Sequence, residues 1–336
     1  MKPVVCFGEL IIDFLNTSSE QGDLLTLNDY RQFPGGAPAN AAVAVAKLGG
    51  NALFAGQVGD DQFGHFLESS LQAFKVNTQF LHKHPVAKTA LAFVTLDQQN
   101  DRSFSFYRDQ TADLLFDQSQ VDDGWFANHP IVHFCSNTLT QTAIADCTAY
   151  VVNQALQHSA TLSFDVNLRH NLWPEKQADA EVVNKLVSRA HIVKFSFDEF
   201  NYLAGQNVDQ YLDYCFSGNC QLLLITNGEK DICYYTKAAS GVVPVSRVKV
   251  VDTTAGGDGF IGGMLFSMAH FERQSELIDD IKTLESIIKF SAHCGASAVT
   301  KKGAFPALPK FSEVAGLIQQ TDPELFEFIK PFAQNR

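Results

Sequence analysis

A regular alternation of apolar runs and helical patterns across residues 131–195 constrains the fold most strongly. Short apolar runs typical of buried strands occur at 131–135, 161–166 and 191–195. Helical patterns separate them, at 140–158 and 175–190. Strands joined by helices at this spacing pair in parallel through right-handed crossovers. The chain is therefore predicted to be an α/β protein with a mostly parallel central sheet.

Other segments predict strands outside this alternation. Further apolar runs occur at 4–7, 222–225, 232–236 and 242–251. Residues 91–97 and 102–108 predict a hairpin around 98–101, because aromatic residues alternate with serines in the second arm. A hairpin does not belong to a parallel doubly wound sheet, so it predicts a small accessory sheet. Residues 14–33 are polar and irregular, without a strong period.

Composition excludes several classes of function. The chain has 336 residues, enough for one large α/β domain or two smaller ones. Its net charge of -12 argues against a nucleic-acid or anionic-membrane partner. No apolar run approaches the roughly 20 residues of a membrane span. The seven cysteines are scattered and lack metal-binding spacing, so they predict reduced thiols and a cytoplasmic protein.

The stretch 248–268 carries the strongest chemical signal. An apolar run at 248–251 predicts the end of a strand, residues 255–257 form a small-residue turn, and a helical period follows from Gly259. A turn that opens a helix directs free N–H groups and the helix dipole at one point, which suits a phosphate or oxyanion. Asp258 within it fits a base that accepts a hydroxyl proton during phosphoryl transfer, and the dipole should keep it ionised. A tight strand-to-helix turn with an N-terminal acid is the plainer interpretation.

This stretch resembles the D-T-x-G-A-G-D signature of the ribokinase-like (PfkB) carbohydrate kinases. The corresponding residues are Asp252, Thr253, Thr254, Ala255, Gly256, Gly257 and Asp258. The order Gly-Ala-Gly has become Ala-Gly-Gly, which would cost about 1–2 kcal/mol if position 255 needed a left-handed backbone. The resemblance spans nearly the whole chain and implies a three-layer sandwich with a small β lid. It implies a single domain over 1–336, with the lid inserted from about 14–34 and 86–110.

Further motifs resemble the sugar-binding segments of this family, closest to the fructokinases. GGAPAN, FYRDQTADLL and DVNLRHNLW match the family's segments in order along the chain. The resemblance implies sugar contacts from Asp13, Gly35, Gly36, Asn40, Arg108, Asn167 and Arg169, together with Asp258. Arg169 would also neutralise charge on the transferred phosphoryl group. Two plainer interpretations stay open: Asp13 as a turn cap, and Arg108 as an exposed edge-strand arginine.

The same resemblance implies a nucleotide site and a cation site. Nucleotide contacts would come from Lys194, Glu199, Thr226, Gly228, Gly257 and Ala292. Ala292 stands where the family usually has asparagine, and Glu199 also fits a plain N-capped helix. A monovalent cation would be bound near Asp252, Thr254, Ala298, Lys301 and Gly303. Lys301 and Lys302 fit equally well as a solvated helix end.

The sequence thus predicts an ATP-dependent sugar kinase, most similar to a fructokinase. Asp258 would act as the base, residues 255–258 as the anion hole, and Mg²⁺ would bridge the nucleotide phosphates, with K⁺ as a further cofactor. The resemblance also implies a homodimer formed through the lid. A 2-keto-3-deoxygluconate kinase and a non-catalytic sugar-binding regulator on the same fold are the alternatives.

Overall fold

Two sheets organise the computed structural model, which describes residues 1–96, 102–273 and 277–333. Within those residues the large sheet has the strand order β13-β12-β11-β10-β9-β8-β1-β4-β5. Its strands are β1 Val4–Phe7, β4 Ala52–Gly59, β5 Asn77–His84, β8 Ile131–Cys135, β9 Thr161–Asp165, β10 Ile192–Ser196, β11 Leu222–Asn227, β12 Lys230–Thr236 and β13 Ser240–Val243. All pairs are parallel except β11 with β12 and β12 with β13. The predicted mostly parallel sheet is confirmed.

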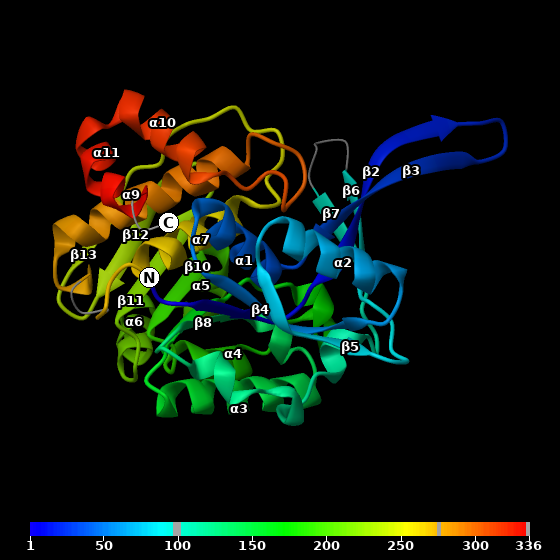
Figure 1. Cartoon of the computed structure of the whole chain (residues 1–336), viewed down its shortest axis with the longest axis horizontal. Coiled ribbons are helices and arrows are strands. Elements are labelled where there is room, and N and C mark those ends of the chain that lie inside the picture. The colour runs from blue at the N-terminus through cyan, green and yellow to red at the C-terminus, as the bar shows by residue number, and fades with distance from the viewer. Residues whose placement is uncertain (97–101, 274–276, 334–336) are drawn as a thin grey trace.

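Helices cover both faces of this sheet (Figure 1). The helices are α1 Ala37–Leu48, α2 Gln62–Ala73, α3 Thr142–Gln157, α4 Ala180–Val187, α5 Phe197–Ala204, α6 Val208–Phe216, α7 Gly256–Met268, α9 Ile281–Ala298, α10 Phe311–Thr321 and α11 Pro323–Ile329. Alternate residues of β1 enter different cores. Val4 and Cys6 pack with α1, α7 and α9, whereas Val5 and Phe7 pack with α3 and α4. This alternation produces the three layers that the family resemblance implied.

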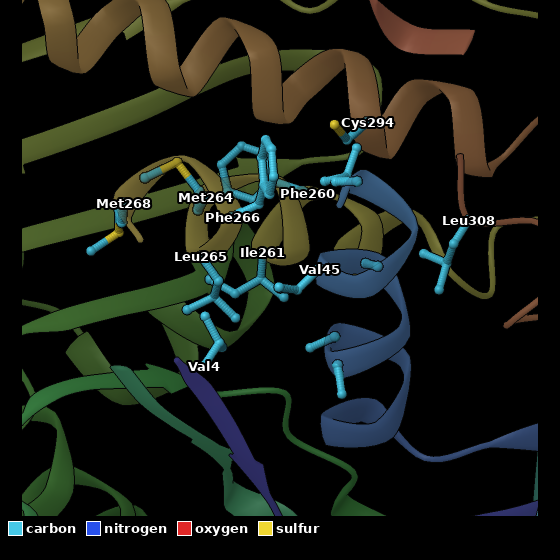
Figure 2. Close-up of a cluster of buried hydrophobic side chains, with 14 of the residues drawn as sticks. Val4, Val45, Phe260, Ile261, Met264, Leu265, Phe266, Met268, Cys294 and Leu308 are labelled. Atoms are coloured by element: carbon cyan, nitrogen blue, oxygen red, sulfur yellow. The ribbon is translucent and has the colours of Figure 1, made fainter. Parts of the chain in front are cut away.

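The first of these cores surrounds α7. Phe260, Ile261, Met264, Leu265 and Phe266 are all buried, and Figure 2 shows them grouped around this helix and α1. Glycines allow the close packing, because a β-carbon on Gly262 would lie 2.2 Å from Cβ of Ala44. The N-terminus of α7 is therefore held rigidly against α1 and α9. None of the described helices combines the length and the apolar character needed to cross a bilayer.

The small sheet projects from one end of the molecule (Figure 1). It contains β2 Ile11–Gln21, β3 Thr26–Gly35, β6 Leu91–Leu96 and β7 Arg102–Tyr107, in the order β3-β2-β6-β7. The predicted hairpin of β6 and β7 is confirmed, and its turn lies outside the described residues. The interpretation of 14–33 as irregular was wrong, because β2 and β3 pair there in an antiparallel ladder. Their outer halves are exposed on both faces, so the sequence shows no apolar period.

Three element boundaries differ from the predictions. The segment predicted as a strand at 242–251 is a strand only to Val243, and Val250 and Val251 are exposed. The helix predicted at 175–190 begins at Ala180, because Glu175 adopts a positive φ and Asp179 caps the N-terminus. The helix predicted from Gly259 begins three residues earlier, inside the glycine turn. The last difference places Asp258 in the first turn of α7.

Candidate active site

The N-terminus of α7 forms the centre of the site. Ala255 precedes the helix with φ −103° and ψ 11°, so the left-handed strain considered for this alanine does not arise. The Gly256 N–H donates to the Thr253 carbonyl at 3.3 Å. The N–H groups of Gly257 and Asp258 lie in the first turn, where a helix offers no carbonyl partner. This end of α7 thus presents N–H donors and the positive end of the helix dipole.

Asp258 is buried at this helix end, with 7% of its surface exposed. Its Oδ2 accepts a hydrogen bond of 2.7 Å from Nδ2 of Asn40 on α1. The pKa of Asp258 is raised to about 7, mainly because the carboxyl is buried and in part because of the negative charge of Asp165. Asn40, Lys194 and Arg169 act in the opposite direction. The expectation that the dipole keeps this acid ionised with an ordinary pKa is therefore wrong, because desolvation outweighs it.

A buried ion pair lies beside this acid. Nζ of Lys194 is 3.0 Å from Oδ1 and 3.1 Å from Oδ2 of Asp165. The two residues are register partners on adjacent strands β10 and β9. A β-carbon placed on Gly257 would lie only 3.3 Å from Nζ of Lys194, so the ammonium reaches the first turn of α7. Lys194 is a predicted residue, whereas Asp165 was quoted in the DVNLR motif without a role.

The DVNLR segment continues past the end of β9. Asn167 adopts a left-handed φ of 39° and is buried. The Leu168 N–H donates to Oε1 of Glu199 at 2.8 Å, and the Ser196 N–H donates to its Oε2 at 2.7 Å. Glu199 thus caps α5 and also fixes the loop after β9, which agrees with the plainer interpretation of a capping box. Arg169 is held next to that loop, and its charge lowers the pKa of Asp258.

Glycines on the other side of the site are required by close contacts. A β-carbon on Gly35 would lie 2.1 Å from Oδ2 of Asp13, which is buried in β2. Gly36 has φ +105°, and a β-carbon there would lie 2.4 Å from the Glu9 carbonyl oxygen. The GG pair therefore lets the chain enter α1 in direct contact with Glu9 and Asp13. Asn40 follows one turn into the same helix.

Arg108 belongs to a buried polar network that the sequence did not reveal. It is 8% exposed, so the interpretation as an exposed edge-strand arginine is wrong. Its Nε contacts Oδ2 of Asp113, and both terminal nitrogens donate to the Asn137 carbonyl at 3.1 Å. Nδ2 of Asn137 in turn donates to Oε1 of Glu9 at 2.9 Å. The network ties the end of β7 to the ends of β1 and β8.

A cavity of about 370 Å³ adjoins the N-terminus of α7. Among its lining residues are the predicted positions Thr226, Gly228, Gly256, Gly257 and Ala292. The predicted positions Lys194 and Glu199 are not among the lining residues of this cavity. The cavity therefore collects residues from the end of β11, the start of α7 and the middle of α9.

Three of the predicted cation residues meet behind the glycine turn. The Thr254 N–H donates to Oδ1 of Asp252 and the Gly303 N–H to its Oδ2, both at 2.8 Å. The hydroxyl of Thr254 is buried without a hydrogen-bond partner. The Ala298 carbonyl accepts from the Lys301 N–H at 3.3 Å, and Nζ of Lys301 pairs with Glu313 at the surface. Among the described residues no group of three His, Cys, Asp or Glu side chains could hold a metal.

Comparison with known proteins identifies the family. A family model described as pfkB family carbohydrate kinase matches residues 1–310. The chain is a member of the pfkB carbohydrate kinase family. Fructokinase-2 of Solanum lycopersicum is 37% identical over 318 residues, covering 94% of this chain and 96% of that protein. A Xylella fastidiosa fructokinase solved with ATP has TM-score 0.88 and 42% identity over 95% of this chain and 98% of its own.

A second solved structure carries a sugar as well. It is a double mutant of fructokinase from Vibrio cholerae O395 with fructose, ADP and potassium ion bound. Its TM-score is 0.83 and its identity 32%, over 94% of this chain and 98% of that chain. The ribokinase-like, mostly parallel fold predicted for this pfkB kinase is thereby confirmed.

The pfkB kinase thus contains two sets of residues at its site. Predicted residues that lie together are Asp258, Asn40, Arg169 and Lys194, with Gly256 and Gly257 facing the neighbouring cavity. Residues that the sequence did not single out are Asp165, Glu9, Asn137 and Asp113. The position of Glu9 and Asp165 at the carboxyl ends of strands was the available signal.

Proposed function

We propose that this pfkB kinase transfers the γ-phosphoryl group of ATP to the primary hydroxyl of fructose, forming fructose 6-phosphate. The relatives named above are fructokinases at 37% and 42% identity over nearly the whole chain. The observation that carries the proposal is the buried carboxylate of Asp258 at the N-terminus of α7, beside a cavity lined by Gly256 and Gly257. A base and an anion-binding helix end thus stand next to a pocket for a nucleotide.

Asp258 is the proposed general base. Its hydrogen bond from Asn40 leaves Oδ1 to approach a sugar hydroxyl. A base with a pKa near 7 can take the hydroxyl proton as the oxygen attacks the γ-phosphorus. The proton then resides on a carboxyl group whose buried surroundings favour the neutral form.

The charge that builds on the transferred phosphoryl group would meet N–H groups and two cations. The N–H groups of Gly257 and Asp258, with the turn at 255–256, form the proposed anion hole. Arg169 and Lys194 supply positive charge, since both lower the pKa of Asp258. The lining of the cavity by Thr226, Gly228 and Ala292 supports binding of the nucleotide there.

Mg²⁺ is the proposed divalent partner of ATP. The described residues offer no three-ligand cluster of acids, histidines or cysteines. Mg²⁺ commonly keeps several waters and binds through substrate phosphates with few protein ligands, so it would enter this site with the phosphates of ATP. Glu199 would act only through groups that it positions, because both of its oxygens accept backbone N–H groups.

Sugar binding is assigned to the opposite side of Asp258. Asp13 and Asn40 offer a carboxylate and an amide, and Gly35 and Gly36 allow the backbone to approach them closely. Asn167 and Arg169 would contact the sugar from the loop after β9. Arg108 is proposed to act through Asn137 and Glu9, because its guanidinium is already engaged with Asp113 and Asn137.

Potassium is the proposed monovalent cation. The Vibrio cholerae relative was solved with potassium ion. In this chain the buried Thr254 hydroxyl without a partner lies beside Asp252 and Gly303, so an oxygen ligand is available there. Ala298 and Lys301 would contribute carbonyl groups.

The small sheet is the proposed lid and homodimer surface. Its β2–β3 hairpin exposes Leu24, Leu25, Leu27 and Tyr30 at 97, 56, 61 and 37%. Apolar side chains on an exposed pair of strands favour association with a second copy.

All seven cysteines are free thiols, which supports the cytoplasm as the location.

Both alternative functions lose support. A 2-keto-3-deoxygluconate kinase would need Arg108 and Arg169 to grip a carboxylate, yet Arg108 is bound by Asp113 and Asn137. The non-catalytic regulator was motivated by the altered turn, yet Ala255 has a negative φ and carries no left-handed strain. Neither alternative is supported by a further observation.

A sugar panel in an ADP-coupled assay tests the proposal. The purified chain is given Mg-ATP and fructose, glucose, ribose or 2-keto-3-deoxygluconate, with potassium present. We expect the highest kcat/KM with fructose, and fructose 6-phosphate as the product. A higher kcat/KM with 2-keto-3-deoxygluconate would reverse the assignment, and no ADP release with any sugar would contradict a kinase.

A further inference from the structure

We infer that Asp165 is a positioning residue for phosphoryl transfer: it pairs with Lys194 and holds its ammonium group beside Gly257 in the first turn of α7. The inference rests on the proposed function. It concerns a residue to which the sequence motifs assigned no role.

Geometry fixes the ammonium group on Asp165. The two side chains start from register partners on neighbouring strands β9 and β10, at the carboxyl ends of these strands. Nζ of Lys194 lies 3.0 and 3.1 Å from the two oxygens of Asp165. The residues are 6% and 2% exposed, so water competes little for either charge. Lys194 can therefore adopt few other orientations while Asp165 is ionised.

The held ammonium faces the proposed anion hole. The point where a β-carbon on Gly257 would lie is 3.3 Å from Nζ of Lys194. A phosphate at the first turn of α7 would therefore meet the Gly257 N–H and this ammonium together. The carboxylates of Asp165, Glu199 and Asp258 all raise the pKa of Lys194. The lysine is thus kept protonated, although burial alone would lower its pKa.

Without Asp165, the carboxylates that still act on Lys194 are those of Glu199 and Asp258. An ammonium paired with either carboxylate would no longer be held beside Gly257, and one paired with Asp258 would also lower the pKa of the proposed base. Besides burial, four groups act on the pKa of the Asp258 carboxyl: Asn40 through its hydrogen bond, and Asp165, Lys194 and Arg169 through their charges. His133 on β8 stays neutral, because burial and the charge of Lys194 lower its pKa to about 3. Asp165 and Lys194 act on Asp258 with opposite signs.

A double-mutant cycle tests this role. The variants are Asp165→Asn, Lys194→Met and the two combined, and each is assayed for kcat and for the KM values of ATP and fructose. We expect each single change to lower kcat/KM for ATP by at least tenfold. In the Lys194→Met background, and at a pH above the acid limb, Asp165→Asn should change kcat/KM for ATP less than threefold further, because its positioning effect acts through the lysine and its direct charge effect on Asp258 moves only the acid limb. The KM for fructose should change less than threefold throughout.

The pH profile provides a readout that a merely structural role would not change. The acid limb of kcat/KM should move to lower pH in Asp165→Asn, because a carboxylate that raises the pKa of Asp258 is gone. It should move to higher pH in Lys194→Met, because a cation that lowers that pKa is gone. Shifts in the same direction, or multiplicative losses in the double variant, would overturn the inference.

Two controls separate other causes. Asp179→Asn removes a carboxylate that caps α4 by accepting N–H groups and should leave kcat/KM within twofold. Asp165→Asn alone could fail to fold because it leaves the Lys194 charge buried without its partner. The combined variant removes both charges. If it folds and has the activity of Lys194→Met, the inference is still supported. If the wild-type chain releases no ADP with any sugar, the proposed function fails instead.

Discussion

Asp258 should make the folded protein less stable as the pH rises, and Asp258→Asn should remove this penalty. Burial raises the pKa of this carboxyl from 3.8 to about 7. Between these values the unfolded chain has released the proton while the folded chain retains it. The folded state binds more protons, so the free energy of unfolding falls with increasing pH in this window. The stability that the protonated Asp258 contributes is fully present below pH 3.8 and is lost above pH 7.

The size of the effect follows from the two pKa values. One pKa unit corresponds to about 1.4 kcal/mol, so the rise from 3.8 to about 7 corresponds to about 4 kcal/mol of lost stability. Asparagine has nearly the same shape, carries no charge, and can still accept the hydrogen bond from Asn40. At pH 8 the variant should therefore be more stable than the wild type. The difference in free energy of unfolding between the two proteins should be about 4 kcal/mol larger at pH 8 than near pH 4.

Thermal unfolding of the two proteins between pH 5 and pH 8 measures this. Near pH 5 the wild type has lost only about a third of the full contribution. The unfolding midpoint of the variant should exceed that of the wild type by roughly 5 °C more at pH 8 than at pH 5. This figure assumes about 2 °C per kcal/mol for a chain of this size. A gain that is the same at both pH values, or that shrinks at pH 8, would refute the argument that this acid is destabilised by burial. Asp179→Asn, at an exposed helix cap, is the matched control and should show no such trend.

Two further predictions concern the glycine turn and the cation. Ala255→Gly should leave kcat within twofold and the unfolding midpoint within about 2 °C, because Ala255 has a negative φ; a large gain in activity would show that this alanine distorts the turn. Replacing potassium by a large organic cation should lower kcat without changing the KM for fructose, because Asp252 and the Thr254 hydroxyl lie behind the turn rather than at the sugar. Equal activity in both salts, measured by ADP release, would contradict the cation proposal.

The centre of the large sheet could be predicted because its strands there are buried on both faces. β8, β9 and β10 consist of short apolar runs bounded by helices, and that pattern indicates parallel strands from local sequence alone. The hairpin of β2 and β3 could not be predicted in the same way. Its outer residues are exposed on both faces, so no apolar face existed to give a period.

The site was predictable where a motif is local. The turn before Asp258, the GG pair and Asn40 are each defined by neighbours in sequence, and the structure brings Asn40 to Asp258 across 218 positions. The ionisation of Asp258 was not predictable, because its burial depends on the packing of α7 against α1 and α9. Arg108 was misjudged for the same reason, since its partner Asn137 lies 29 residues away.

The pairing of Asp165 with Lys194 illustrates the remaining gap. Each residue lies at the carboxyl end of a predicted strand, yet only Lys194 was predicted as a site residue. That they are register partners depends on which strands are neighbours and how they align. The sequence therefore indicated the edge of the sheet at which chemistry occurs but not which charges meet there.

The central claim is that Asp258 takes the proton from the sugar hydroxyl, and one paired measurement on Asp258→Asn tests it most directly. Fructose binding is measured by calorimetry, and ADP release is measured at saturating fructose and Mg-ATP. The account predicts a dissociation constant within about threefold of wild type and a kcat reduced by roughly 10²–10⁴-fold, the usual contribution of a general base. A kcat within a few fold of wild type in a protein that still binds fructose would contradict it.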